Sequence, residues 1–329
     1  MPKFLIIRFS SIGDIVLTTP VIRALKQQVP DAEVHFLTKE AFLPILKANP
    51  YLDKVHVLAH SWELMIHELK EEKYDAVIDL HHNLRTLRVK KELGVRSVAF
   101  NKLNIQKFMY VNFKWNRMPA VHIVDRYMET IKEWNVVNDG RGLDYFIPEE
   151  EHIVNEDIPV SHHAGYLGFV LGAAHATKKM PVDKWKELAG SIPHPIILLG
   201  GKEDAEAGRA IATVDPIKIY NACGKFSLNE SADLVRRAKL IVTHDTGLMH
   251  IAAAYKRPII SLWGNTVPAF GMYPYYGNSQ VNNAQVEIKG LWCRPCSKIG
   301  YDKCPKGHFK CMNQISIPLL TQQVLSFIK

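Results

Sequence analysis

The sequence THDTGLMH, at residues 243–250, is the stretch from which the fold of this chain can be worked out. The apolar run before it, Leu240–Val242, is typical of a buried strand, and the residues from Thr246 onward are typical of a helix. A helix that starts directly after a strand exposes unpaired backbone N–H groups, and its dipole favours an anion there. The stretch therefore predicts a turn that binds phosphate.

Single residues of this stretch fit that role. Asp245 is a good helix N-cap, and Gly247 lets a ligand approach the backbone closely. His250 follows Thr246 by four residues, so both side chains are expected on one helix face. An isolated histidine on a helix is more often a core residue than a ligand.

A second junction of the same kind opens the chain, where the apolar run Phe4–Ile7 precedes a short polar loop and an amphipathic run at 15–29. The loop contains small and polar residues that we expect to face a ligand, namely Ser10, Ser11, Gly13 and Asp14. Two such junctions, one near each end of the chain, suggest a cleft between two halves.

Short apolar runs alternate with helical patterns along both halves. Strands are expected at 4–8, 34–37, 54–58, 76–80, 97–100, 166–171, 195–199, 218–221, 240–243 and 258–262. Helices are expected at 62–71, 121–134, 181–191, 204–213, 227–238 and 246–254. This alternation predicts an α/β fold with two Rossmann-like domains. We expect them at 1–155 and 156–316, with a polar linker at about 138–160 and a C-terminal helix at 317–329 that packs back on the first domain.

Positive charge is concentrated in one segment. The net charge of the 329 residues is +8, and residues 85–117 alone contain nine basic residues and one acidic residue. Aromatic residues are interleaved with these cations, a mixture suited to an anionic membrane surface or a phosphorylated amphiphile. Nucleic-acid binding and an ordinary solvated surface are the alternatives. No apolar run approaches the ~20 residues that span a bilayer, so a cytoplasmic location is expected.

Several motifs of other enzyme classes are absent from the sequence. G-x-G-x-x-G follows neither first strand, and G-x-x-x-x-G-K-[ST], H-E-x-x-H and G-x-S-x-G do not occur. These absences argue against dinucleotide redox enzymes, P-loop NTPases and the hydrolases with those signatures. Asp-x-Asp is missing too, which argues against a sugar transferase that holds its donor diphosphate through a divalent ion.

Four segments carry a family resemblance when they are taken together and in order. They are residues 8–20 at the opening, 172–181, 199–203, and 245–250 with the alanines at 252–254 and residues 258–264 that follow. The chain resembles the ADP-heptose:lipopolysaccharide heptosyltransferases in all four. The second segment of this chain is similar to the family's donor-phosphate loop, and the third to the end of its nucleoside-binding strand. The fourth is similar to the family's donor-site signature.

The resemblance implies an inverting GT-B glycosyltransferase, whose two Rossmann-like domains face each other across a cleft. It places the donor on the C-terminal domain and the acceptor on the N-terminal domain. Asp14 then matches the general base that removes the acceptor's hydroxyl proton, although an aspartate in a first helical turn also has a purely structural role. On the acceptor side we also expect Ser10, Ser11, Gly13, Arg85 and Arg88.

The donor-side assignments follow from the same resemblance. Lys178 matches the cation that neutralises the departing diphosphate, with its neighbour Lys179 as the alternative. Hydrogen bonds to the diphosphate are expected from Thr177, Thr246 and Gly247. Glu203 is expected to contact the nucleoside, and Asp245 with His250 the sugar hydroxyls or a phosphate oxygen. No cofactor is expected to take part in catalysis.

The C-terminal cysteines form a separate group, because four of the five lie within nineteen positions: Cys293, Cys296, Cys304 and Cys311. In a cytoplasmic protein this density argues for a structural zinc site rather than for disulfides. Free thiols packed in a loop are the alternative. Cys223 is expected in the core.

The sequence therefore predicts a cytoplasmic glycosyltransferase at the inner face of the membrane that moves a heptose from ADP-heptose to a lipid A/core lipopolysaccharide acceptor. Its expected partners are the ADP-linked donor, the lipid-anchored acceptor and the anionic membrane surface, without nucleic acid. A GT-B transferase that uses another nucleotide sugar for a different surface glycan is the first alternative. A nucleic-acid-binding module that uses segment 85–117 is the second.

Overall fold

The computed structural model describes residues 1–58 and 61–328, and these residues divide into two compact units. Unit 1 contains Met1–Lys102, Val121–Pro148 and Tyr275–Ser279. Unit 2 contains the remainder, namely Leu103–Ala120, Glu149–Pro274 and Gln280–Lys329. The chain thus passes between the units more often than the single cut expected near residue 155.

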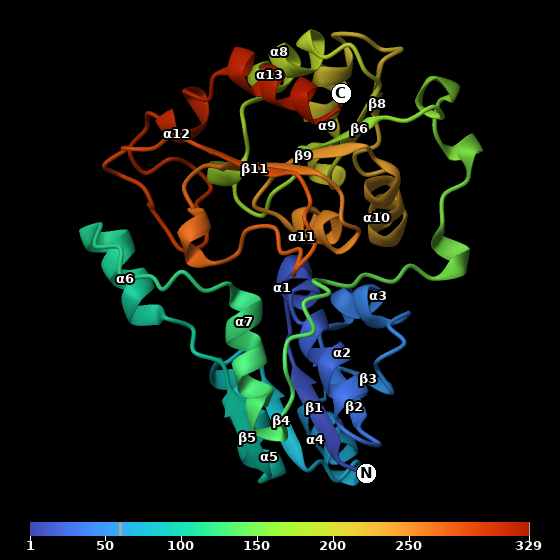
Figure 1. Ribbon diagram of the computed structural model, residues 1–329, viewed down its shortest axis with the longest axis vertical. Helices are drawn as coiled ribbons and strands as arrows, with labels where there is room; N and C mark the ends of the chain where they lie inside the picture. Colours follow the sequence, from blue (N-terminus) through green and yellow to red (C-terminus); the bar gives the residue numbers. More distant parts are fainter. Residues whose placement is uncertain (59–60, 329) are drawn as a thin grey trace. The chain divides into compact units, whose positions relative to one another are not determined.

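Unit 1 is built on a five-stranded parallel sheet with the strand order β3-β2-β1-β4-β5 (Figure 1). Its strands are β1 (Lys3–Ile7), β2 (Glu33–Thr38), β3 (Lys54–Val57), β4 (Ala76–Asp79) and β5 (Arg96–Ala99). Its α-helices are α1 (Ile12–Val16), α2 (Thr19–Gln28), α3 (Leu43–Leu46), α4 (Trp62–Glu71), α5 (Leu84–Leu93) and α7 (Ile123–Met128). The 3-10 helices are Glu40–Phe42 and Glu129–Trp134. Each of the five strands expected in this half is present.

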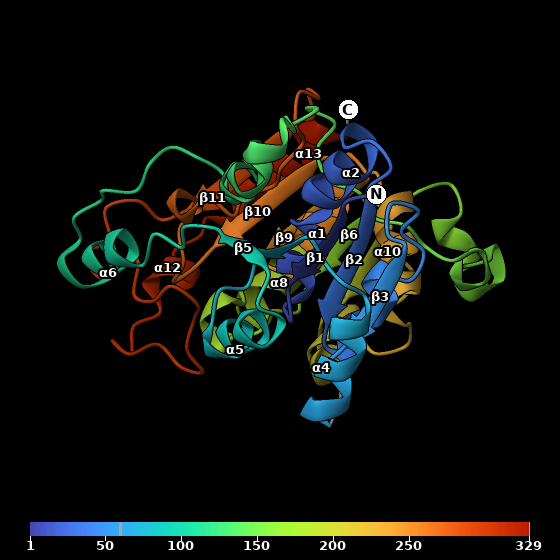
Figure 2. The same cartoon turned by 90° about the horizontal axis from the view of Figure 1, so that it is seen from below.

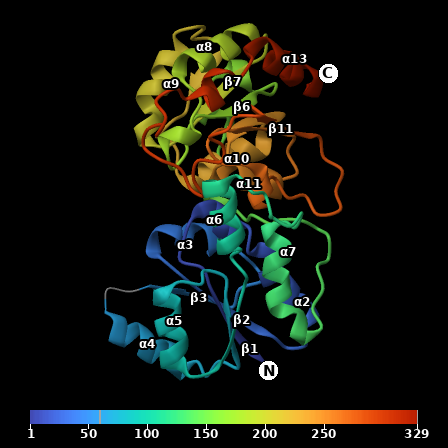
Figure 3. The ribbon, with the colours of Figure 1, turned by 90° about the vertical axis from the view of Figure 1, so that its left-hand side faces the viewer.

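Helices cover both faces of this sheet. Figure 3 shows α4 and α5 on one side of the strands and α2 and α7 on the other. Met65 and Leu69 of α4 and Val89 of α5 are buried in one cluster with Leu5 and Leu37. Such apolar strands, buried on both faces, are what a parallel sheet requires.

Unit 2 is built on a six-stranded parallel sheet with the order β11-β10-β9-β6-β7-β8. Its strands are β6 (Leu167–Val170), β7 (Ile196–Leu199), β8 (Ile219–Asn221), β9 (Leu240–His244), β10 (Ile259–Trp263) and β11 (Asn283–Glu287). Its α-helices are α6 (Asn104–Phe113), α8 (Val182–Ser191), α9 (Ala205–Ala212), α10 (Leu228–Arg237), α11 (Gly247–Ala254), α12 (Lys310–Asn313) and α13 (Ile317–Phe327). The 3-10 helices are Glu149–Glu151, Asn155–Asp157, Val160–His162, Ala176–Lys178, Lys202–Asp204 and Pro268–Phe270.

The strand order of each sheet reverses at one place. In unit 1 the chain builds outward from β1 to β3 and then returns to place β4 on the other side of β1. In unit 2 it builds from β6 to β8 and then returns to place β9 beside β6. The loops at the carboxyl ends of the two strands flanking a reversal diverge to opposite faces, which leaves a crevice where open α/β sheets bind ligands.

Two segments leave the unit that their sequence neighbours belong to. Lys114, which ends α6, donates hydrogen bonds from Nζ to the carbonyls of Cys293 (3.3 Å) and Pro295 (2.8 Å), so α6 lies beside the segment that leads to α12 (Figure 2). In the other direction, the Tyr275 ring stacks on His122, and its hydroxyl lies 2.7 Å from the amide nitrogen of Asn138.

The polar stretch at 138–160, predicted as the linker between the domains, contains a boundary between the two units, and each of its parts is held within its own unit. The fully buried Arg23 of α2 binds Asp139, Asp144 and the carbonyl of Gly142, which fixes the first part within unit 1. In unit 2, the buried carboxylate of Asp233 accepts from the backbone N–H of Ile153. The buried charges thus anchor both ends of the stretch, and the unit boundary falls at residue 148.

Several helix ends differ from the expectation. Thr246, not Asp245, is the N-cap residue of α11, because the Asp245 carboxylate is taken up by Lys178 and Thr266. Pro181 is the N-cap residue of α8 rather than a first-turn residue. The helix expected at 121–134 is α7 followed by a 3-10 helix. The helix expected at 227–238 is α10, whose N-cap residue Ser227 forms a capping box with Glu230.

The C-terminal helix α13 was expected to pack back on the first domain. The contacts described for it are with α8 in its own unit, where Ile317, Leu320 and Val324 join the core. Ser191 and Thr321 also form a hydrogen bond of 2.7 Å between these helices. Lys329, the last residue of the expected helix, lies outside the described residues. Among the described residues, no helix is long and apolar enough to cross a membrane.

One polar cluster interrupts the apolar layer under α4. The imidazoles of His35 and His56 are buried there, and burial lowers the pKa of His56 to about 4 and also lowers that of His35. Hydrogen bonds from Lys54 and Lys3 lower the pKa of Glu72 to about 2. At neutral pH the cluster therefore contains two neutral imidazoles beside a carboxylate.

Candidate functional site

Asp14 lies at the strand-order reversal of unit 1, in the short helix that follows β1. Its Oδ1 is 2.7 Å from Arg8 Nη2, and its Oδ2 accepts a 2.9 Å hydrogen bond from the Ser11 hydroxyl. The buried Arg8 also donates from Nη1 to the carbonyl of Leu80, which follows β4, at 2.6 Å. Arg8 therefore bridges the two strands of the reversal and fixes Asp14 beside them.

The electrostatic surroundings keep Asp14 ionised. Burial by itself raises the pKa of this carboxyl, but the charge of Arg8 and the hydrogen bonds from Ser11 outweigh it, so the pKa is below its ordinary value. Its side chain is 19% exposed, so a ligand can reach it. The same contacts give Asp14 a structural role in the first helical turn, which the sequence had also allowed.

The other residues expected on the acceptor side are only partly gathered here. Ser10 and Ser11 are at least partly exposed next to Asp14, whereas Gly13 is buried in α1. Arg85 and Arg88 are exposed on α5, and the Arg88 guanidinium lies 4.3 Å from the centre of the Trp62 ring. Arg88 thus has an aromatic partner of its own in unit 1.

In unit 2 the reversal brings together the loops that follow β6 and β9. Lys178 comes from the first loop, Asp245 from the second, and Lys178 Nζ is 2.6 Å from Asp245 Oδ2. The Thr266 hydroxyl, after β10, donates to the same oxygen at 3.1 Å. Both side chains of the ion pair remain about one-seventh exposed (14% and 13%), so an incoming anion has access to them.

The structure distinguishes Lys178 from Lys179. Lys179 Nζ forms an ion pair of 2.6 Å with the buried Asp204, whose other oxygen accepts from the N–H of Gly201. Lys179 and Asp204 also line a cavity of about 330 Å³ with apolar walls such as Trp185 and Phe309. Only Lys178 therefore points to the turn after β9.

Thr177 has a structural role as well as its predicted place in the loop. It is 2% exposed, its hydroxyl donates to Asn265 Oδ1 (3.1 Å), and it accepts from the N–H of Tyr301 (2.8 Å). The buried Asn265 Nδ2 has no hydrogen-bond partner within the described ranges 1–58 and 61–328. Asn265 and Thr266, which follow residue 264 at the end of the segment similar to the donor-site signature, were not predicted from the sequence.

The start of α11 is accessible, as the phosphate-binding prediction requires. Asp245, Thr246 and Gly247 are all partly exposed, whereas His250 is 2% exposed. The histidine that shapes the site is His244, whose Nε2 accepts from the N–H of Met180 at 2.8 Å. Burial lowers the pKa of His244 to about 3, which keeps this acceptor unprotonated.

Glu203, for which a nucleoside contact was predicted, lies in the turn after β7. Its side chain is exposed and curls over Gly201, where a β-carbon would collide with the carboxylate. Glycine at this position therefore leaves room for the Glu203 carboxylate.

The four C-terminal cysteines lie in one loop region of unit 2. The Cys293 and Cys311 side chains are buried, and the Cys296 thiol donates to the carbonyl of Cys293 at 3.0 Å. Burial and the neighbouring thiols raise the pKa of Cys296 to about 12. Burial also raises the pKa of Cys311, to about 11. Within the described part of the chain, no three of these sulfurs lie within 4.8 Å of one another.

Proteins of known sequence and structure are similar to this chain over most of its length. Lipopolysaccharide heptosyltransferase 1 of Pseudomonas aeruginosa is 27% identical over 327 residues, which cover 90% of this chain and 86% of the relative. The crystal structure of a glycosyltransferase family 9 protein from Veillonella parvula has a TM-score of 0.79 at 23% identity and covers 99% of this chain and 97% of its own. Heptosyltransferase WaaC of E. coli, solved with ADP, has a TM-score of 0.69 at 22% identity and covers 99% of both chains.

These structures confirm the predicted α/β fold of the GT-B type with two Rossmann-like sheets. A sequence model of glycosyltransferase family 9 (heptosyltransferase) matches residues 62–301, which is most of the chain. The protein therefore belongs to glycosyltransferase family 9, the heptosyltransferase family, and is a glycosyltransferase.

Proposed function

We propose that this enzyme transfers heptose from ADP-heptose to a lipid-anchored lipopolysaccharide core acceptor, with inversion at the anomeric carbon. The observation that carries the proposal is the Lys178–Asp245 ion pair beside the accessible start of α11. This pair provides a cation for a diphosphate and a carboxylate for a sugar in one place. The relatives named as lipopolysaccharide heptosyltransferases support the choice of sugar and acceptor.

The donor diphosphate binds, in this proposal, by replacing Asp245 as the partner of Lys178. The partly exposed backbone of Thr246 and Gly247 adds N–H donors, and Asn265 Nδ2 adds a donor that has no other hydrogen bond in the described structure. Phosphate oxygens thus meet one full positive charge and several dipoles. Since the sequence has no Asp-x-Asp motif, these groups rather than a divalent ion stabilise the departing ADP.

The released Asp245 carboxylate then accepts hydrogen bonds from heptose hydroxyls. Thr266 donates to the same oxygen that Lys178 contacts, so it keeps the carboxylate in place after Lys178 turns to the phosphates. His250 and Glu203 remain proposed contacts to the donor, through the sugar or a phosphate and through the nucleoside respectively. Asp245 in this way links recognition of the sugar to recognition of the diphosphate.

Asp14 is proposed as the general base. Its carboxylate takes the proton from the acceptor hydroxyl as that oxygen bonds to the anomeric carbon, and the bond from the anomeric carbon to the ADP oxygen breaks on the opposite face. Arg8 keeps the base ionised, and its five-donor guanidinium fixes the orientation of the carboxylate. Ser10, Ser11 and Arg85 are the remaining proposed contacts to the acceptor.

The acceptor is proposed to be reached at the anionic inner face of the cytoplasmic membrane, where the enzyme binds peripherally. Helix α6 has no buried residue, and four large apolar side chains of this region are more than half exposed: Ile105, Phe108, Phe113 and Trp115. Lys107 on the same helix adds positive charge. Phe100, in contrast, is a core residue, so not every aromatic residue of segment 85–117 takes part. No nucleic acid is expected to bind.

The four C-terminal cysteines are proposed to hold a structural zinc ion that closes the loop between Cys293 and Cys311. The four thiols supply a complete donor set, and Lys114 already fixes the carbonyls of Cys293 and Pro295 next to them. In a tetrahedral thiolate site the sulfurs lie about 3.8 Å apart, so the sulfurs of this loop have to approach one another on binding. This metal supports the fold and takes no part in the transfer.

A thermal-shift screen against nucleotide sugars tests the donor. We expect ADP-heptose to raise the melting temperature more than ADP-glucose, UDP-glucose or GDP-mannose at equal concentration. At one hundred times its Kd, a ligand adds about 2.7 kcal/mol to stability. A larger shift with another nucleotide sugar would show that this sugar nucleotide, and not ADP-heptose, is the donor. No shift together with steeply salt-dependent RNA binding would favour a nucleic-acid-binding protein.

The Asp14→Asn substitution tests the base. We expect turnover to fall at least about a hundredfold while ADP affinity stays unchanged, because the amide cannot accept the proton. Because Arg8 lowers the pKa of Asp14, the acid limb of kcat/KM in the wild type should lie below the ordinary aspartate pKa of about 3.9. The exposed Asp31→Asn serves as the matched control. Near-normal turnover of the Asp14 variant would remove it from the mechanism.

Metal analysis of the purified protein tests the cysteine site. We expect about one zinc per chain to be lost in the Cys296→Ser/Cys304→Ser double variant and kept in Cys223→Ser, whose thiol is buried in the core. Equal metal content in both variants would show that the thiols are free. Iron at the same stoichiometry would keep the site and change the metal.

A further inference from the structure

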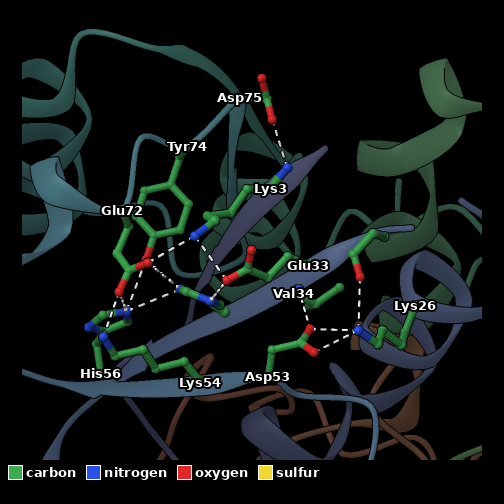
Figure 4. Close-up of polar contacts among 12 residues, drawn as sticks. Lys3, Lys26, Glu33, Val34, Asp53, Lys54, His56, Glu72, Tyr74 and Asp75 are labelled. Carbon is green, nitrogen blue, oxygen red and sulfur yellow. Dashed lines mark hydrogen bonds and ion pairs between the residues drawn. The ribbon is translucent and has the colours of Figure 1, made fainter. Parts of the chain in front are cut away.

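The polar cluster under α4 lies on one face of the unit 1 sheet, between the middle of β2 and β3 and the turn before β4, whereas Asp14 follows the carboxyl end of β1. Strand pairing puts His35 opposite Leu5 and Lys54, and His56 opposite Leu37. Because side chains alternate along strands, both histidines lie on the face that α4 covers. Glu72 and Tyr74, from the turn between α4 and β4, reach the same point (Figure 4).

The nitrogens and oxygens of this cluster converge. His56 Nε2 is 3.3 Å from His35 Nδ1. The two Glu72 oxygens are 3.9 Å from His35 Nδ1 and 4.0 Å from His56 Nε2. Within the described structure, His35, His56 and Glu72 therefore form a group in which each residue offers one potential metal-ligand atom, and these atoms all lie within 4.8 Å of one another.

The tautomer of His35 is fixed by a neighbouring carboxylate. His35 Nε2 is 2.8 Å from Glu33 Oε1, and a carboxylate only accepts, so Nε2 carries the proton. Nδ1 therefore presents its lone pair to His56 and Glu72. A carboxylate behind a histidine in this way is the usual arrangement around histidine ligands of metals, where it orients the ring.

We propose that His35 Nδ1, His56 Nε2 and the Glu72 carboxylate bind a divalent zinc ion on the face of the unit 1 sheet that α4 covers. Glu33 is the positioning residue behind His35, and a water completes the tetrahedron. The ion ties β2, β3 and the turn before β4 together. Its role is structural, because it holds three segments of unit 1 together, whereas the contacts described for Asp14 are with Arg8 and Ser11. The site is independent of the transfer reaction proposed above.

The distances suit zinc. Two nitrogens at about 2.0–2.1 Å from a tetrahedral zinc lie about 3.3–3.4 Å apart, and the two imidazole nitrogens are already at this separation. The carboxylate needs to approach by roughly half an ångström for the same geometry. Two imidazoles with one carboxylate are also a donor set that zinc takes in proteins.

The lysines near Glu72 do not prevent this. Lys54 binds Glu72 Oε1, but its side chain is 53% exposed and can turn to solvent. Lys3 binds Glu72 Oε2 and also Glu33, and can keep both contacts because a carboxylate oxygen has more than one lone pair. Without metal, the Tyr74 hydroxyl, 2.9 Å from both imidazole nitrogens, links them by hydrogen bonds. Burial raises the pKa of this phenol, so it acts there as a neutral group.

Cobalt substitution separates this site from the cysteine site. Chelator-stripped, full-length protein is titrated with Co²⁺, and we expect visible d–d absorption that arises without thiolate-to-metal charge transfer. His56→Gln should abolish this component, whereas the exposed His67→Gln should retain it. Glu33→Gln should lower the Co²⁺ affinity of this site about 10–100-fold, because it removes the carboxylate that orients the His35 ring.

Zinc-dependent stability gives a second readout that does not require enzyme activity. We expect Zn²⁺ to raise the melting temperature of the Cys296→Ser/Cys304→Ser variant, and the shift to vanish when His56→Gln is added. Retained ADP binding in His56→Gln would show that unit 2 is folded and that ADP binding does not depend on the metal site in unit 1. A cobalt spectrum or zinc shift that is the same with and without His56 overturns the proposal and leaves a hydrogen-bonded cluster.

Discussion

The reversal of strand order in each parallel sheet is the constraint on which the sites of this protein depend. Strands on either side of the reversal send their following loops in opposite directions, and side chains from the two loops can then meet in the gap. In unit 2 this meeting is the Lys178–Asp245 ion pair. In unit 1 it is Arg8, which joins the loops after β1 and β4 and fixes Asp14. One topological rule thus brings together the side chains of both proposed sites.

The charged side chains of each site also form ion pairs. Lys178 and Asp245 compensate each other, as do Arg8 and Asp14, so no buried charge is left without a partner when substrate is absent. The two pairs differ in what a ligand has to do. Arg8 holds Asp14 with the help of the Leu80 carbonyl and stays in place, whereas Lys178 has a flexible stem and can exchange a carboxylate for a diphosphate.

Sequence reasoning succeeds here where the signal is local. The strands were predicted from their apolar and β-branched residues. The turn after β9 was predicted because a strand pattern is followed directly by the start of a helix pattern. β11 was missed because its sequence, NAQVE, is polar, as an edge strand permits. Asp245 was predicted to be the N-cap residue of a helix, but its carboxylate forms an ion pair with Lys178 instead. These two residues are far apart in the sequence, so no local pattern predicts the pair. His35 and His56 are neighbours only through the pairing of β2 with β3, so their cluster had no signal in the sequence.

The most direct test of the account is whether Lys178 recognises a diphosphate. Calorimetry should compare ADP with AMP for the wild type, Lys178→Ala and Lys179→Ala. A charge-assisted hydrogen bond contributes about 1.5–3 kcal/mol, so the wild type should prefer ADP by about tenfold or more. The account predicts that this preference nearly disappears in Lys178→Ala and persists in Lys179→Ala. An unchanged preference in Lys178→Ala would contradict it.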